Sequence, residues 1–67
     1  MKRYVQELAA DRKRDLANCL KFAAMHDLEE NIESCTEEIE RIDSILNLCK
    51  YGYISDYEAV KLLINPY

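Results

Sequence analysis

The side chains with the most reactive chemistry in this chain are three cysteines and one histidine: Cys19, Cys35, Cys49 and His26. A metal site or a nucleophilic centre needs several such groups within a few ångströms of one another. On one helix, Cys35 and Cys49 would be about 21 Å apart, and Cys19 would lie two turns from His26. The sequence therefore predicts no metal site, no cofactor, no catalytic residue and no enzymatic activity.

The cysteines have a simpler interpretation as small core residues. Cys19 and Cys35 can approach each other if the chain folds back between them, but no C-x-x-C spacing or second histidine completes a set of four ligands. All three fall on apolar helix faces, where a free thiol behaves as a small hydrophobe. An odd number of cysteines without close pairs is not a secreted disulfide framework, so we expect a reducing, cytoplasmic environment. His26 is expected in a solvated loop.

The chain's charges are segregated along its length. The net charge is −4, but residues 1–26 carry six basic and three acidic side chains, a net of +3. Residues 27–49 carry eight acidic side chains against one arginine, a net of −7. Opposite charge on two consecutive segments predicts that the segments face each other.

Hydrophobic spacing predicts that both segments are helices. No glycine or proline occurs before Gly52, and apolar residues recur every three or four positions. In the second segment they form a continuous heptad seam: Leu28, Ile32, Cys35, Ile39, Ile42, Leu46 and Cys49. In the first segment the apolar face is interrupted by Arg12 and consists of Val5, Leu8, Ala9, Leu16, Cys19, Leu20 and Ala23.

A loss of phase between the two seams at the sequence "MHDLEE" predicts a chain reversal there. We expect helices over 3–25 and 28–51, with Asp27 capping the second and Glu30 as its capping-box partner. In an antiparallel hairpin, Arg12 would lie level with Glu37 and Glu40. Close helix approach would be allowed by alanines at 9, 10, 17, 23 and 24. Whether the hairpin closes on itself or exchanges a helix with another chain stays open.

The stretch "YGYISDYE" predicts a second corner. Gly52 suits the left-handed position after a helix, and Ser55 with Glu58 matches a capping box that Ile54 flanks as a staple. A short helix is expected over 56–64, ended by Asn65–Pro66. The predicted fold class is all-α, a single domain over 1–67: an antiparallel two-helix hairpin with a short third C-terminal helix folded back on its open end.

Tyrosines indicate a protein-binding function. A chain of this length buries only a modest core, so a partner or a second copy is expected. Tyrosine is enriched in interfaces, and this hairpin would gather all five of its tyrosines at one end. The predicted partner or oligomer interface comprises Tyr4, Ile45, Leu48, Tyr51, Tyr53, Tyr57, Leu62, Leu63 and Tyr67. We expect a non-enzymatic protein-interaction or regulatory protein, a homodimer whose hairpins complete a four-helix bundle. Phe22 and Met25 form a second, smaller candidate patch.

Two alternative functions involve nucleic acid. The first is a nucleic-acid mimic that inhibits a nucleic-acid-binding enzyme through an acidic ridge, which consists of Glu29, Glu30, Glu33, Glu37, Glu40 and Asp43. The second is weak nucleic-acid binding through "RKR" at 12–14. Consecutive helical residues point about 100° apart, and the neighbouring acidic helix would repel phosphates. Nucleic acid is therefore the less favoured partner.

The sequence also predicts no membrane association. No stretch approaches the roughly 20 apolar residues of a membrane span. Glu7 and Asp11 interrupt any signal-peptide core that could follow Lys2 and Arg3. A short chain beginning at Met1 is typical of a free-standing reading frame, and we expect an accessory protein of bacterial, phage or mobile-element type.

Overall fold

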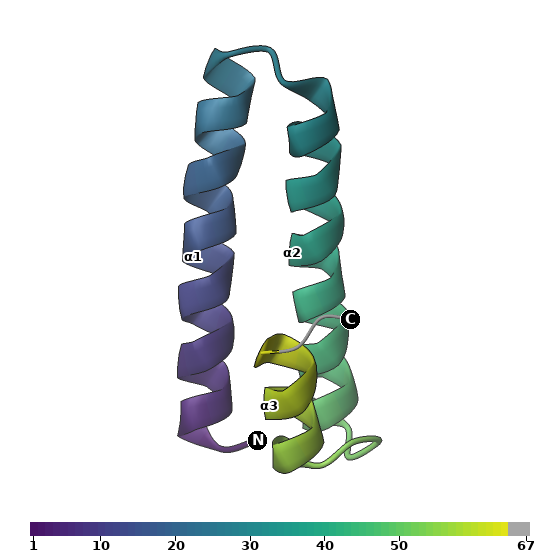
Figure 1. Ribbon diagram of the computed structural model, residues 1–67. Helices are drawn as coiled ribbons and strands as arrows, with labels where there is room; N and C mark the ends of the chain where they lie inside the picture. Colours follow the sequence, from purple (N-terminus) through teal and green to yellow (C-terminus); the bar gives the residue numbers. More distant parts are fainter. Residues whose placement is uncertain (65–67) are drawn as a thin grey trace.

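The structure, a computed structural model, describes residues 1–64 as three α-helices joined by short connections (Figure 1). The helices are α1 (Arg3–Met25), α2 (Glu29–Lys50) and α3 (Asp56–Ile64). No strand occurs among these residues, so the prediction of an all-α protein is confirmed. Asn65, Pro66 and Tyr67, which include the predicted end signal of the last helix, lie outside the described residues.

The two long helices run antiparallel along a molecule of 39 × 18 × 18 Å, and α3 packs against both at the end that holds the N-terminus (Figure 1). The five alanines expected between the helices divide into two groups. Ala9 and Ala23 are buried, whereas Ala10, Ala17 and Ala24 are exposed. The expectation for the last three was wrong, because they lie on a flank of α1 that no other part of residues 1–64 covers.

The hydrophobic core lies where all three helices meet. Its buried members are Val5, Ala9, Ile42, Ile45, Cys49, Ala59 and Leu63. Towards the hairpin loop the α2 seam is less enclosed: Ile32, Cys35 and Ile39 are half-buried, and Leu28 is exposed. The reason is that α3 has nine residues and covers only one end of the hairpin (Figure 1).

The reversal between α1 and α2 is built by the end of α1 and not by a cap on α2. Asp27 has a φ of 54°, and the Leu28 N–H donates to the Ala23 carbonyl at 2.9 Å. This is the six-to-one bond of a Schellman motif with Asp27 at the left-handed position. The predicted N-cap role of Asp27 was therefore wrong, since Leu28 is the N-cap residue and no side chain caps it.

The corner between α2 and α3 uses the same Schellman motif, with glycine at the left-handed position. Gly52 has a φ of 82°, its N–H donates to the Cys49 carbonyl at 3.2 Å, and the Tyr53 N–H donates to the Leu48 carbonyl at 2.9 Å. Both bonds of a Schellman motif are present. Glycine adopts this conformation without the steric cost of a Cβ atom. The predicted role of Gly52 is confirmed.

Both ends of α3 are held by hydrogen bonds. The Glu58 N–H donates to Ser55 Oγ at 3.1 Å, and that hydroxyl donates to Glu58 Oε1 at 3.2 Å, so the predicted capping pair is formed. At the other end, Arg41 Nη2 of α2 donates to the Leu62 carbonyl at 3.2 Å. A carbonyl in the last turn of a helix has no partner within the helix, and a cation there is favourable.

The long helices carry many charged side chains. Eight of the 23 residues of α1 are charged, as are nine of the 22 residues of α2. Within residues 1–64, no helix combines the length and the apolar character that crossing a membrane requires.

Candidate functional site

The tyrosines of the α2–α3 corner lie on the surface at one end of the molecule. Tyr51 and Tyr53 belong to the turn after α2, and Tyr57 belongs to the first turn of α3. Their exposed fractions are 69%, 78% and 71%. Tyr4, in the first turn of α1, is exposed at the same end, where the N-terminus meets the start of α3 (Figure 1). We call Tyr4, Tyr51, Tyr53 and Tyr57 the tyrosine end.

Cations and aliphatic side chains accompany the tyrosine end. The Lys50 Nζ lies 5.6 Å from the centroid of the Tyr51 ring, and the Lys61 Nζ lies 5.9 Å from that of Tyr57. These are cation–π distances, and both rings remain about seven tenths exposed. Leu48 and Leu62 are also exposed, by 42% and 37%.

Two residues of the predicted interface, Ile45 and Leu63, are not part of this surface. Ile45 and Leu63 are buried in the core, because α3 covers the apolar flank of α2 that extends beyond its seam. The prediction that these two residues face a partner is therefore wrong, since each is enclosed within its own chain. Tyr67 lies outside the described residues.

The acidic ridge is fully presented to solvent. All six of its members, Glu29, Glu30, Glu33, Glu37, Glu40 and Asp43, are exposed. Among residues 1–64 only Asp43 of this set forms an ion pair, with Lys13 Nζ at 2.6 Å. The other five carboxylates leave a strongly negative strip along α2.

Three of the five basic residues of α1, by contrast, pair with acids within residues 1–64. Arg3 pairs with Glu7 at 3.2 Å, and Arg14 pairs with Asp11 at 3.3 Å. Within the described chain Arg12 forms no ion pair with Glu37 or Glu40, the residues expected to lie level with it, and Lys13 pairs with Asp43 of α2 instead. The three paired basic side chains are less available to a phosphate backbone than unpaired ones would be.

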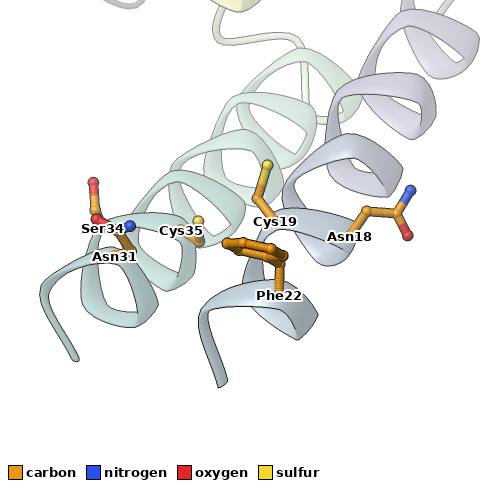
Figure 2. Close-up of a pocket in the computed structure, with 6 residues that line it drawn as sticks. All are labelled: Asn18, Cys19, Phe22, Asn31, Ser34 and Cys35. Atoms are coloured by element: carbon orange, nitrogen blue, oxygen red, sulfur yellow. The ribbon is translucent and has the colours of Figure 1, made fainter. Parts of the chain in front are cut away.

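The cysteines occupy three different environments. Cys49 is buried, Cys35 is half-buried and Cys19 is exposed, so the expectation of a core position fails for Cys19. Cys19 and Cys35 line one open groove between α1 and α2 near the hairpin loop, together with Asn18, Phe22, Asn31 and Ser34 (Figure 2). Among residues 1–64 no three His, Cys, Asp or Glu side chains gather to hold a metal ion.

Phe22 and His26 lie at this loop end. Their ring centroids are 4.3 Å apart in a tilted arrangement, and Figure 2 shows the Phe22 side chain extending from α1 towards α2. Phe22 is 60% exposed and Met25 is 78% exposed. Both rings are exposed, and no carboxylate or thiol within residues 1–64 forms a hydrogen bond or ion pair with His26, so we interpret the pair as a surface contact.

Asp56 is a connecting residue that sequence reasoning missed. Its Oδ1 accepts hydrogen bonds from the Lys2 N–H at 3.3 Å and from Cys49 Sγ at 3.2 Å, which ties the N-terminus, α2 and α3 together. The Cys49 hydrogen bond, followed by that of Lys2, lowers the pKa of Asp56. Burial, then the Asp56 contact, raises the pKa of the Cys49 thiol. No sequence signal joins these positions, because they meet only through the α3 fold-back.

Comparisons with known proteins find no significant match: no protein-family model, no curated protein and no solved structure resembles this chain closely enough to be assigned as a relative. The surfaces described above are therefore interpreted from the chain's own residues. The candidate sites are the tyrosine end, the acidic ridge and the groove near the hairpin loop.

Proposed function

We propose that this protein is a non-enzymatic interaction protein that associates with itself as a helical bundle and binds a protein partner through its tyrosine end. The observation that carries the proposal is the exposure of Tyr51, Tyr53 and Tyr57, each by roughly seven tenths, around a single corner. A tyrosine ring contributes a large apolar area and keeps a hydroxyl for hydrogen bonding, which suits the centre of a protein interface.

The rigidity of the corner supports this proposal. The Gly52 motif and the Ser55–Glu58 cap fix the backbone on both sides of Tyr53. A surface held in its bound shape loses little conformational entropy when a partner docks. The nearby Lys50 and Lys61 favour a partner that presents carboxylates next to apolar groups.

The binding half of the proposal is tested by comparing two double variants in affinity capture from the source cell. Tyr53→Ala/Tyr57→Ala should lose a partner that the native chain retains, because truncating a tyrosine at the centre of an interface can cost about 2 kcal/mol, which is about 30-fold in Kd. Phe22→Ala/Met25→Ala removes comparable exposed area at the opposite end and should retain that partner. Equal capture by the native chain and the tyrosine variant contradicts the assignment of the tyrosine end.

The self-association half is tested by light scattering after size exclusion under reducing conditions. Across a hundredfold range of concentration we expect a dimer at the upper end, since so small a core is commonly supplemented by a second subunit. A mass of one chain, 7.9 kDa, at every concentration contradicts it.

A second candidate function rests on the acidic ridge. Five of its carboxylates make no ion pair within residues 1–64, so they are free to occupy a basic groove of a nucleic-acid-binding enzyme. Changing Glu33, Glu37 and Glu40 to lysine should abolish binding to such a partner. If the captured partner is retained by this triple variant and lost by the tyrosine variant, the acidic-ridge function is wrong.

A further inference from the structure

Three consecutive residues of α2 distinguish the two sides of the hairpin. Arg41 reaches the Leu62 carbonyl of α3, Ile42 is buried, and Asp43 pairs with Lys13 of α1. Successive helical residues point about 100° apart, so Arg41 and Asp43 project to opposite sides of Ile42. The Lys13–Asp43 pair therefore marks the side of the hairpin that α3 does not cover.

The residues that surround this ion pair form a surface that we call the open face. Residues three or four positions apart lie on the same side of a helix. The open face therefore includes the residues at this spacing from Lys13 on α1 and from Asp43 on α2. Its aliphatic members are Ala10, Ala17, Leu20 and Ala24 of α1 with Ile32, Ile39 and Leu46 of α2. The alanines are exposed and the larger four are half-buried. A shallow groove lined by Gln6, Ala10, Lys13 and Leu46, among others, continues it towards the N-terminus.

The open face resembles the inner surface of a helix bundle, on which further helices pack. Ala10, Ala17 and Ala24 recur every seven residues, so small side chains follow α1 along its length. A neighbouring helix can approach such a surface closely, and the half-buried Ile39 and Leu46 would lose their remaining contact with water. The opposite side of the hairpin is not open to a second hairpin along its whole length, because α3 packs on it at the end that holds the N-terminus (Figure 1).

We propose that the open face binds a second copy of this chain in a parallel, twofold arrangement, with α1 of each copy lying on α2 of the other. The proposal rests on the self-association proposed above, and it specifies the surface and the orientation. The two hairpin loops would lie at one end of the four-helix bundle and the two tyrosine ends at the other.

Charge complementarity selects this arrangement over the alternative. Two identical faces can also pack antiparallel, but α1 would then lie on α1 and α2 on α2. Residues 27–49 carry a net charge of −7, so that alternative places two strongly negative segments against each other. In the parallel dimer each of these segments faces residues 1–26, with a net of +3. Attraction between opposite segments favours the parallel pairing, and like-charge contact disfavours the other.

The surface is tested with a matched pair of neighbouring substitutions. Ala17→Arg places a long cationic side chain on the open face, whereas Asn18→Arg adds the same charge on the flank that carries the loop-end groove. Both positions are exposed, so both variants should keep native helicity by circular dichroism. An arginine is too large for helices that approach closely over alanine, so we expect Ala17→Arg to raise the dimer Kd by about tenfold or more despite the acidic segment of the other copy. Asn18→Arg should change the Kd by less than about threefold. Ala24→Arg is a second probe of the same face with the same expected loss.

The orientation is tested by the distance between spin labels on the two hairpin loops. His26→Cys is labelled in a Cys19→Ser/Cys35→Ser background, where the remaining Cys49 is buried. The parallel dimer predicts a short distance, comparable with the 18 Å width of one molecule. The antiparallel dimer predicts a distance that approaches its 39 Å length.

The outcomes separate this inference from the function on which it rests. A protein that is monomeric at every concentration overturns the proposed self-association and this inference with it. A dimer that Ala17→Arg and Ala24→Arg leave intact keeps self-association and overturns the open face. A dimer sensitive to Ala17→Arg but with distant labels overturns the pairing of α1 with α2. Loss of partner capture by the tyrosine variant, with the dimer retained, agrees with both proposals.

Discussion

At the scale of single residues, the two chain reversals use one backbone motif with different residues. Asp27 and Gly52 both adopt a positive φ, 54° and 82°, directly after a helix end. A Cβ atom makes this conformation unfavourable by roughly 1–2 kcal/mol, although aspartate and asparagine tolerate it better than most residues. The first reversal is therefore less stable than it could be.

Replacing Asp27 with glycine should stabilise the protein. Removal of the left-handed strain exceeds the added entropy of the unfolded chain, and we expect a gain of about 0.5–1 kcal/mol in the free energy of unfolding. Urea denaturation followed by circular dichroism measures it. Gly52→Ala is the converse control, because it adds a Cβ atom at a positive φ. It should lower the free energy of unfolding by about 1 kcal/mol, although the Cβ would meet no atom within 4 Å. A loss of stability in Asp27→Gly would contradict this account of the loop.

The hydrogen bonds around Asp56 make stability depend on pH. In the folded chain the Cys49 and Lys2 donors lower the pKa of the Asp56 carboxyl, whereas in the unfolded chain it has its ordinary value, near 4. The unfolded state therefore takes up the proton first, and the stabilisation is complete above about pH 4 and lost as the pH falls through the lowered value. The raised pKa of Cys49 affects stability at alkaline pH instead, because the folded state favours the neutral thiol.

We expect the stability advantage of the native chain over Asp56→Asn to be constant near neutral pH and to shrink below about pH 4. Thermal unfolding of both proteins at a series of pH values from 2 to 7, at one protein concentration, measures it. Parallel curves for the two proteins over that range would show that the Asp56 carboxylate does not contribute.

At the scale of elements, α3 determines where the core forms. It contributes Ala59 and Leu63, and Leu63 is almost completely buried against α1 and α2. Because α3 is also fixed by its cap and by Arg41, it behaves as part of the fold and not as a loose tail. The adjacent Leu62 carries the carbonyl that Arg41 binds, but its own side chain is partly exposed.

This difference predicts contrasting effects for two neighbouring leucines. Leu63→Ala should lower the free energy of unfolding by about 2–4 kcal/mol, since it leaves a cavity among α1, α2 and α3. Leu62→Ala has the same chemistry at a more exposed site and should cost less than about 1 kcal/mol. Denaturation at matched protein concentration compares them. Similar losses would mean that α3 does not pack on the hairpin through Leu63.

At the scale of the whole molecule, segregated charge is the dominant feature. A positive segment and a negative segment lie side by side in one chain, joined by the Lys13–Asp43 pair. Such a molecule is attracted to itself when α1 of one copy meets α2 of another. It is repelled when the two acidic helices meet.

Salt should therefore weaken the proposed dimer. Raising sodium chloride from about 20 mM to about 1 M shortens the screening length to roughly 3 Å and removes most attraction between exposed charges. We expect the dimer Kd, measured by sedimentation equilibrium, to increase by about threefold or more. A Kd that decreases as salt is added would indicate repulsion between the subunits, as expected for α2 packed on α2.

The local features of the fold could be predicted from the sequence because they depend on neighbouring residues. Helix content follows from the absence of glycine and proline before Gly52. The corner follows from Gly52, Ser55 and Glu58, whose hydrogen bonds span only a few residues. The loop at Asp27 was misassigned because a cap before α2 and a left-handed residue after α1 suit the same residue type.

Which surfaces remain available is decided by tertiary structure, because burial depends on contacts between residues distant in sequence. Ile45 and Leu63 resemble interface residues in the sequence, but α3 encloses both. Ala17 resembles a residue between packed helices, but it lies on an exposed flank that nothing within residues 1–64 covers. By itself the sequence determined three helices, two corners and a separation of charge. Only the tertiary structure decided which faces of those helices are already occupied, since a helical pattern identifies an apolar face without specifying what packs on it.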